Sequence, residues 1–159
     1  MKFKHLLACL LFPAACGVLA APFTVSADGQ EVTDTKTGLV WRRCAEGMTT
    51  SGGTCTGTAS TFTHDAALTR ASTQATATAT GVAWRLPNVK ELSSIADKSR
   101  SNPAIDTAAF PATPASWFWS SSPYVGFAGS AWYVNFNDGY VGGSYRDYAF
   151  YVRLVRAGQ

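Results

Sequence analysis

Helix-like spacing of apolar residues appears in the first half of the chain. Between residues 61 and 75 the apolar positions, including Phe62 and Leu68, recur every three or four residues, as they do on one face of an amphipathic helix. Before this segment, the apolar run Leu-Val-Trp at residues 39–41 follows a turn-forming cluster, which predicts a strand. We expect one further strand within residues 21–37.

A second helix is predicted to begin just after Asn88. Asparagine is a favourable N-cap residue, and Glu91, three residues later, can complete a capping box. The preceding Pro87 keeps the chain before it extended. We therefore expect a short helix over residues 89–96.

Residues 98–116 contain three prolines and little periodicity. They predict a long irregular connection that packs onto the body of the domain through Ile105 and Phe110. Connections of this length are uncommon in compact domains and are often functional.

Strand-like alternation dominates the last third of the chain. Residues 131–136 place Tyr133 and Asn135 on the face opposite to Trp132. The Asn-Asp-Gly sequence at residues 137–139 is a hairpin turn signal. Further strands are predicted at residues 117–121, 140–144 and 149–155. Because helices precede a mainly antiparallel sheet, we expect an α+β fold with two short helices and long irregular loops.

The first twenty residues predict a secretory signal peptide. Lys2 and Lys4 precede an apolar run that ends in an A-x-A-like cleavage site at Ala20. The run is too short to span roughly 30 Å of hydrocarbon and is interrupted by a proline. We expect cleavage after Ala20 and export to the periplasm, the cell surface or the medium. Cys16 lies in what resembles half a lipobox, so a lipid anchor remains an alternative.

Length and composition indicate one globular domain, which we place at residues 21–159. The 159 residues leave room for a single domain, and the 13% aromatic content excludes collagen, coiled coil and extended disorder. Loss of Lys2 and Lys4 lowers the net charge from +3 to +1, and no long basic run remains. We therefore expect no nucleic-acid partner and no transmembrane segment in the mature chain.

Cys44 and Cys55 are the two cysteines of the mature chain. In an oxidising compartment such a pair predicts a disulfide. Residues 45–60 are rich in Gly, Ser and Thr, so we expect a loop held by that disulfide. The mature chain has one histidine, His64, and no Cys-x-x-Cys motif, so we predict neither a metal site nor a redox pair.

Tyrosine, serine and glycine are concentrated near the C-terminus. Residues 117–151 contain 13 of the 18 aromatic residues of the mature chain and all six tyrosines, but only three charged residues. We assign to the core Trp41, Trp84, Trp119, Trp132 and Phe136. Tyrosine offers large rigid contact area and small polar residues offer adaptable hydrogen bonds. The other aromatic and polar residues of this segment therefore predict a ligand-binding surface, with ordinary sheet packing as the alternative. Its candidate residues are Tyr124, Phe127, Tyr133, Asn135, Tyr140, Tyr145, Arg146, Asp147 and Tyr148.

A catalytic or metal site is not predicted. His64 and Asp65 are neighbours in a predicted helix and do not face each other, and no G-x-S-x-G motif is present. Residues 137–138 supply two candidate oxygen ligands, whereas calcium usually has six or more. We therefore predict no catalytic residues and no cofactor. We expect Arg153 and Arg156 to be solvated or paired within the sheet.

Six motifs in a fixed order carry a resemblance to a known family. They are Asp34-x-x-Thr37-Gly38-Leu39-Val40-Trp41, the cysteine pair, Thr63-x-x-Ala66-Ala67-Leu68, Trp84-Arg85-Leu86-Pro87-Asn88-x-x-Glu91-Leu92, Trp119-Ser120-Ser121-Ser122 and Tyr151-Val152-Arg153-Leu154-Val155-Arg156. This order resembles the Lcl C-terminal domain family over about residues 28–156. The resemblance implies a C-type-lectin-like fold related to the formylglycine-generating-enzyme type, with paired first and last strands. It also implies extracytoplasmic binding, with sulfated polysaccharide suggested for the collagen-like adhesin that names the family.

We therefore predict an exported, adhesin-like module that binds a glycan or a surface partner through its tyrosine-rich C-terminal loops. The chain lacks the collagen-like repeat of the adhesin. Two alternatives remain, namely a protein-binding component of a surface or pilus-like assembly and an enzyme with an unrecognised site.

Overall fold

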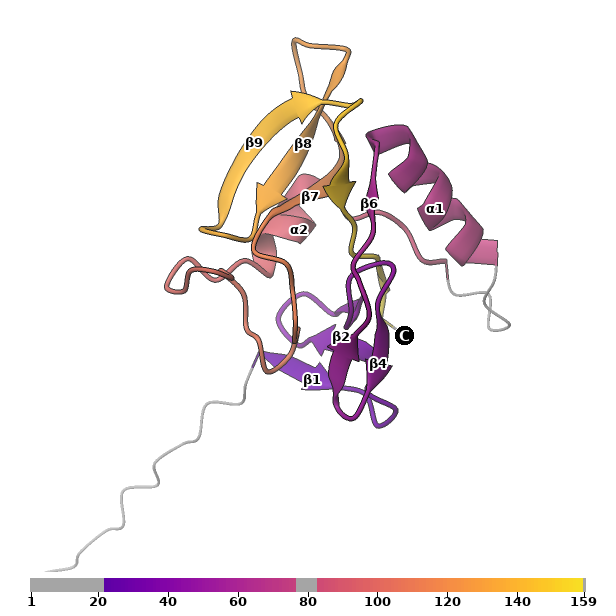
Figure 1. Cartoon of the computed structure of the whole chain (residues 1–159), viewed down its shortest axis with the longest axis vertical. Coiled ribbons are helices and arrows are strands. Elements are labelled where there is room, and N and C mark those ends of the chain that lie inside the picture. Colours follow the sequence, from indigo (N-terminus) through magenta and orange to yellow (C-terminus); the bar gives the residue numbers. More distant parts are fainter. Residues whose placement is uncertain (1–21, 77–82, 159) are drawn as a thin grey trace, which may run out of the picture.

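The computed structural model describes residues 22–76 and 83–158 and has an α+β architecture (Figure 1). Two sheets, a short hairpin and two helices form the described part of the chain, which confirms the predicted fold class. The expected signal peptide, residues 1–20, and the candidate anchor Cys16 lie outside the described residues. Within the described ranges, neither helix is long and apolar enough to cross a membrane.

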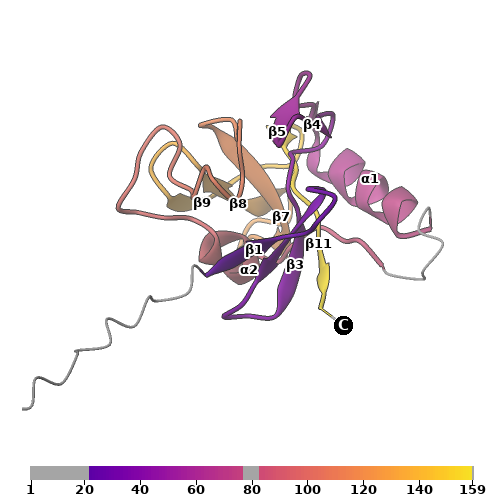
Figure 2. The same cartoon turned by 90° about the horizontal axis from the view of Figure 1, so that it is seen from below.

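A four-stranded antiparallel sheet joins the start of the domain to its end. In spatial order its strands are β1 (Phe23–Val25), β2 (Glu31–Asp34), β3 (Leu39–Arg42) and β11 (Val155–Ala157). Val155 of β11 lies opposite Trp41 of β3, and the two strands lie side by side in Figure 2. The last strand therefore pairs with β3, not with the first strand as the resemblance implied.

A five-stranded sheet carries the aromatic C-terminal segment. In spatial order its strands are β6 (Thr61–Phe62), β10 (Phe150–Tyr151), β7 (Trp117–Pro123), β8 (Ser130–Asn135) and β9 (Tyr140–Tyr145). The predicted turn connects β8 to β9 through Gly139, whose φ of 77° glycine adopts without strain. The prediction of a single strand over residues 149–155 is wrong, because the chain crosses there from the five-stranded sheet to the four-stranded sheet.

Both predicted helices form, with different limits. In α2 (Val89–Ser94), the Glu91 backbone N–H donates to Asn88 Oδ1 at 2.9 Å and the Asn88 N–H donates to Glu91 Oε2 at 2.8 Å. The capping box is therefore confirmed, although the helix ends two residues before the predicted limit. Helix α1 (His64–Thr76) begins after residues 61–62, because these pair with β10 instead.

Cys44 and Cys55 form the predicted disulfide, with their Cα atoms 5.5 Å apart. The segment that it closes is not the expected irregular loop. Strands β4 (Thr49–Ser51) and β5 (Thr54–Thr56) form an antiparallel hairpin inside it. The sequence gives little sign of this hairpin, because its strands lack an apolar alternation.

Two clusters of buried side chains lie on opposite faces of the five-stranded sheet. Phe118 and Val134 pack on the α2 side, whereas Trp119 and Ala131 pack on the α1 side, as alternation along a strand requires. Ile105 and Phe110 are fully buried, so the irregular connection packs onto the body as predicted.

Four of the five aromatic residues assigned to the core are buried, and Trp132 is the exception. Its ring is half-buried and lies 4.6 Å from that of Tyr124. Helix α2 is six residues long and covers only part of this face of β8, which leaves the tryptophan at the border.

Arg153 contradicts the expectation of a solvated or sheet-paired arginine. It is fully buried, and it donates to the backbone carbonyls of Arg42 and Arg43 and to Thr113 Oγ1. Burial lowers its pKa to about 9, so the guanidinium keeps its charge at neutral pH. Arg156 does pair within the sheet, with Glu31 at 2.6 Å.

Candidate functional site

Exposed aromatic rings gather around β7, β8 and β9. Strand register places Trp117, Tyr133 and Tyr140 on one face of the sheet and Tyr145, at the end of β9, on the other. Trp117, Tyr140, Tyr145 and Tyr148 are 46–62% exposed, which is unusual for rings of this size. Helix α1 packs on the face of Trp117, near Trp119 and Phe150. We call the rings of Trp117, Tyr133, Tyr140, Tyr145 and Tyr148 the aromatic surface.

The rings of the aromatic surface hold one another in place. Tyr133 lies 5.8 Å from Trp117, 6.4 Å from Tyr140 and 5.5 Å from the buried Phe150, measured between ring centroids. Tyr148 stacks on Phe150 with an angle of 21° between the ring planes. Aromatic pairs at these separations attract each other, so the surface is a pre-formed platform.

Two consecutive glycines in β9 make room for the tyrosine rings. A Cβ atom on Gly142 would lie 2.7 Å from Cε1 of Tyr140 and 2.9 Å from the hydroxyl oxygen of Tyr133. A Cβ on Gly143, which points to the other face, would overlap the ring of Tyr124. Glycine inside a strand often marks such a close approach.

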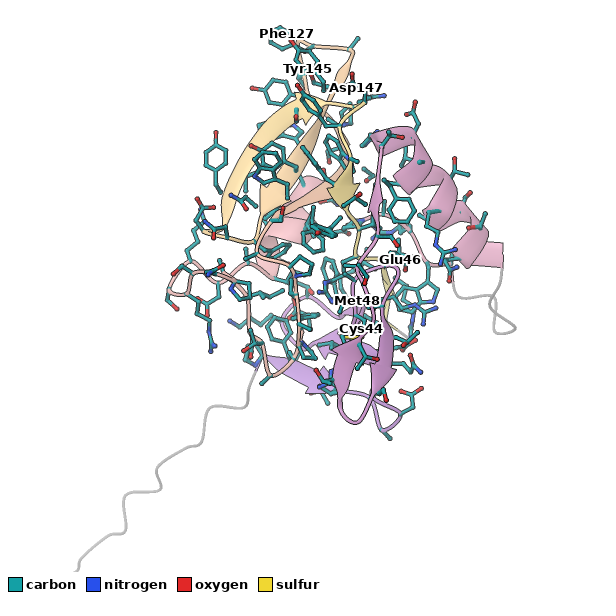
Figure 3. The ribbon with its side chains drawn as sticks, viewed as in Figure 1. Cys44, Glu46, Met48, Phe127, Tyr145 and Asp147 are labelled. Atoms are coloured by element: carbon teal, nitrogen blue, oxygen red, sulfur yellow. A yellow bond between two sulfur atoms is a disulfide. The ribbon has the colours of Figure 1, made fainter. Side chains whose placement is uncertain are left out.

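Four of the predicted ligand-binding residues meet at the tip of the sheet. Tyr124, Phe127, Tyr145 and Tyr148 line a shallow hollow of about 360 Å³ together with small residues of β8 and β9. Phe127 is 64% exposed there. Figure 3 shows Phe127, Tyr145 and Asp147 close together at this end of the molecule.

Arg146 and Asp147 border a neighbouring hollow of about 500 Å³, which shares Tyr145 with the first. Arg146 is half-buried, and its Nε–H donates to the carbonyl oxygen of Ser130 at 3.3 Å. The carboxylates of Asp65 and Asp147 line the same hollow. One cation therefore faces two anions, and the hollow is not a strongly positive site.

The hydroxyl groups of the candidate tyrosines are available to a ligand. Among the described residues, none accepts or donates a hydrogen bond at the hydroxyls of Tyr124, Tyr133, Tyr140, Tyr145 and Tyr148. Burial, with smaller contributions from Tyr140 and Asp138, raises the pKa of Tyr133. Its hydroxyl therefore remains protonated and able to donate at neutral pH.

Asn135 is a candidate residue whose side chain already takes part in a hydrogen bond within the fold. Its side-chain oxygen accepts a hydrogen bond from the Asn137 N–H at 3.0 Å, so this end of the amide stabilises the turn.

Trp117 belongs to the aromatic surface, although it is not among the ligand-binding residues predicted from the sequence. The available signal was the alternation of residues 117–121, which places Trp117 on the same face as Trp119.

The residues considered for catalysis have structural partners. His64 is 1% exposed, and its Nε2–H donates to the carbonyl oxygen of Ser120 at 3.0 Å. Burial lowers the pKa of His64, so the ring is neutral at pH 7. The Ser120 hydroxyl donates to the Trp132 carbonyl at 2.8 Å, and the Ser122 hydroxyl accepts from the Val89 N–H. These contacts join α1 and α2 to β7 and β8.

Comparison with known proteins adds one finding. A family model described as the Lcl C-terminal domain matches residues 30–156, a range that includes both helices and the whole aromatic surface. No curated protein and no solved structure matches the chain.

Proposed function

The chain belongs to the Lcl C-terminal domain family, and from this we propose that it is an exported, adhesin-like module that binds glycans through the aromatic surface. The family indicates a surface module, and the ligand is our inference from the site. We further propose that the domain has the C-type-lectin-like fold that the resemblance implies.

The observation that carries the proposal is the linked set of exposed rings. The C–H faces of sugar rings are apolar and stack on aromatic side chains, while their hydroxyl groups need hydrogen-bond partners. The aromatic surface offers both, because its rings are exposed and its tyrosine hydroxyls have no partners among the described residues. Pre-positioned rings also lose little conformational freedom on binding.

The charges near the surface bear on the kind of glycan. Arg146 is the cation at the tip, and it faces Asp65 and Asp147. A neutral saccharide would bind by stacking and hydrogen bonds, with little dependence on salt. A sulfated polysaccharide would bind through Arg146, and its affinity would fall as salt screens the charges.

We propose a binding role and no catalytic one. The imidazole of His64 is buried against Trp119, and the hydroxyls of Ser120 and Ser122 are hydrogen-bonded within the fold. A nucleophile and base would need to lie within hydrogen-bond reach of each other and of a substrate.

The free edge of β9 favours a second candidate function. β9 is one of the two edge strands of the five-stranded sheet in the described part of the chain. An extended segment of a partner protein can add to such an edge through backbone hydrogen bonds. This arrangement fits a component of a surface or pilus-like assembly that binds protein.

A glycan-array screen of the purified protein tests the proposal. The array includes neutral and sulfated saccharides, with and without calcium, at two salt concentrations. We expect calcium-independent binding to at least one glycan class. Absence of binding, together with a stoichiometric protein partner in a pull-down, would instead support the second candidate.

A further inference from the structure

A separate pocket lies between the disulfide-closed segment and α1, away from the aromatic surface. It has a volume of about 290 Å³. The polar and charged side chains that line it include Gln30, Arg42, Glu46, Arg70 and Gln74. Figure 3 shows Cys44, Glu46 and Met48 of this pocket well separated from Phe127 and Tyr145. Nothing in the proposed glycan site uses this pocket.

Arg42 lines the pocket, and its guanidinium has unused hydrogen-bond donors. Its guanidinium carbon lies 4.3 Å from the ring centroid of Trp84, a cation–π contact that holds the group in place. Within the described ranges, no carboxylate lies within ion-pair distance of this guanidinium and none of its N–H groups donates a hydrogen bond. A half-buried guanidinium in this state is ready to bind an anionic group.

Arg70 and Glu46 set the charge of the pocket. Arg70 Nε–H donates to Glu46 Oε2 at 2.7 Å, and the carboxylate of Glu46 is largely buried. This bond uses one donor of Arg70 and leaves both terminal nitrogens without an acceptor among the described residues. With Arg42, the three groups carry a net charge of +1, which matches one negative charge on a ligand.

We propose that this pocket binds a small hydroxylated monocarboxylate, of the size of a single uronic acid. The planar fork of an arginine matches the two oxygens of a carboxylate. The side-chain amides of Gln30 and Gln74 line the pocket and have no hydrogen-bond partner among the described residues, so they can serve ligand hydroxyls. The volume lies just below the range of pockets for drug-sized molecules, which limits the ligand to about one ring.

An NMR titration of the purified protein with sodium glucuronate tests the proposal. We expect saturable shifts in the backbone signals of residues 42–50 and 70–74, and none with uncharged methyl glucoside. Arg42→Gln and Arg70→Gln should each weaken binding about tenfold or more, because each removes a charge-assisted hydrogen bond. Arg70 is exposed on α1, so its variant tests the site even where Arg42→Gln disturbs the fold.

Two controls separate this site from other arginines and from the aromatic surface. Arg100→Gln removes an exposed arginine that pairs with Asp97 and should leave glucuronate binding unchanged. Tyr140→Ala should also leave it unchanged, so this proposal and the glycan proposal succeed or fail independently. Absence of saturable binding, unchanged affinity in Arg70→Gln, or equal affinity for sodium sulfate would overturn the carboxylate site.

Discussion

The guanidinium of Arg153 lies 4.9 Å from the ring centroid of Phe110 and donates to the hydroxyl of Thr113. It also donates to two backbone carbonyls at the end of β3. One buried cation thereby joins the crossing between the two sheets to β3 and to the long irregular connection. No carboxylate of the described residues forms an ion pair with it.

Replacement of Arg153 should be strongly destabilising. Arg153→Ala leaves two carbonyls and one hydroxyl buried without their donor and opens a cavity beside Phe110. We expect a loss of about 3–5 kcal/mol in the free energy of unfolding, as for other broken buried networks. Urea unfolding followed by tryptophan fluorescence measures it. Arg100→Ala, at an exposed ion pair, should change little, and equal effects of the two variants would contradict the account.

The disulfide should contribute stability by restricting the unfolded chain. The double variant Cys44→Ser with Cys55→Ser should lower the free energy of unfolding by about 2–3 kcal/mol, as expected for a short closed loop. Reductant added to the unmodified protein should produce the same shift in the urea midpoint. A double variant as stable as the oxidised protein would show that the hairpin is held by its other contacts.

His64 should make the protein sensitive to mild acid. Burial holds its pKa below the ordinary value of 6.5, so the unfolded chain binds a proton more tightly than the folded one. The free energy of unfolding should therefore fall as pH decreases below about 6.5. The hydrogen bond to Arg85 lowers the pKa of Glu91. The stability that this carboxylate contributes is therefore lost only as the pH falls below its ordinary pKa of 4.5.

His64→Gln tests this assignment, because the amide can still donate to the Ser120 carbonyl but does not titrate. The variant should show a nearly flat stability profile between pH 6.5 and 5. A slope as steep as that of the unmodified protein would assign the acid sensitivity to other groups.

Gly142 should be needed for the shape of the aromatic surface. In Gly142→Ala the new methyl group displaces Tyr133 or Tyr140, because both rings lie within 3 Å of its position. We expect an altered near-ultraviolet circular dichroism spectrum and weaker glycan binding. Gly129→Ala is the matched control, since its Cβ would meet no atom within 4 Å. Identical spectra for the two variants would contradict the packing described.

Features set by neighbouring residues could be predicted from the sequence. The capping box depends on Asn88 and Glu91, which are three residues apart, and the β8–β9 turn on three consecutive residues. The α+β class followed from the order of helical and strand-like segments. The disulfide followed from the two cysteines that remain after the expected signal peptide, because an exported protein meets an oxidising compartment.

Features set by distant segments could not be predicted. Arg153 is buried because carbonyls about 110 residues away accept its hydrogen bonds, and nothing adjacent to it indicates those partners. The half-exposure of Trp132 depends on the short length of α2. For the candidate site, the sequence indicated a region and not an arrangement. The structure groups four of the predicted residues at the tip, turns the Asn135 oxygen to the hairpin turn and places Trp117 beside Tyr133.

The affinity of the double variant Trp117→Ala with Tyr140→Ala for the best glycan on the array decides whether the aromatic surface binds glycans. Isothermal titration calorimetry should show at least about tenfold weaker binding, because two exposed stacking rings are lost. Leu68→Ala, which removes an exposed apolar side chain from α1, should bind as the unmodified protein does. Unchanged affinity in a correctly folded double variant would show that the aromatic surface is not the glycan site.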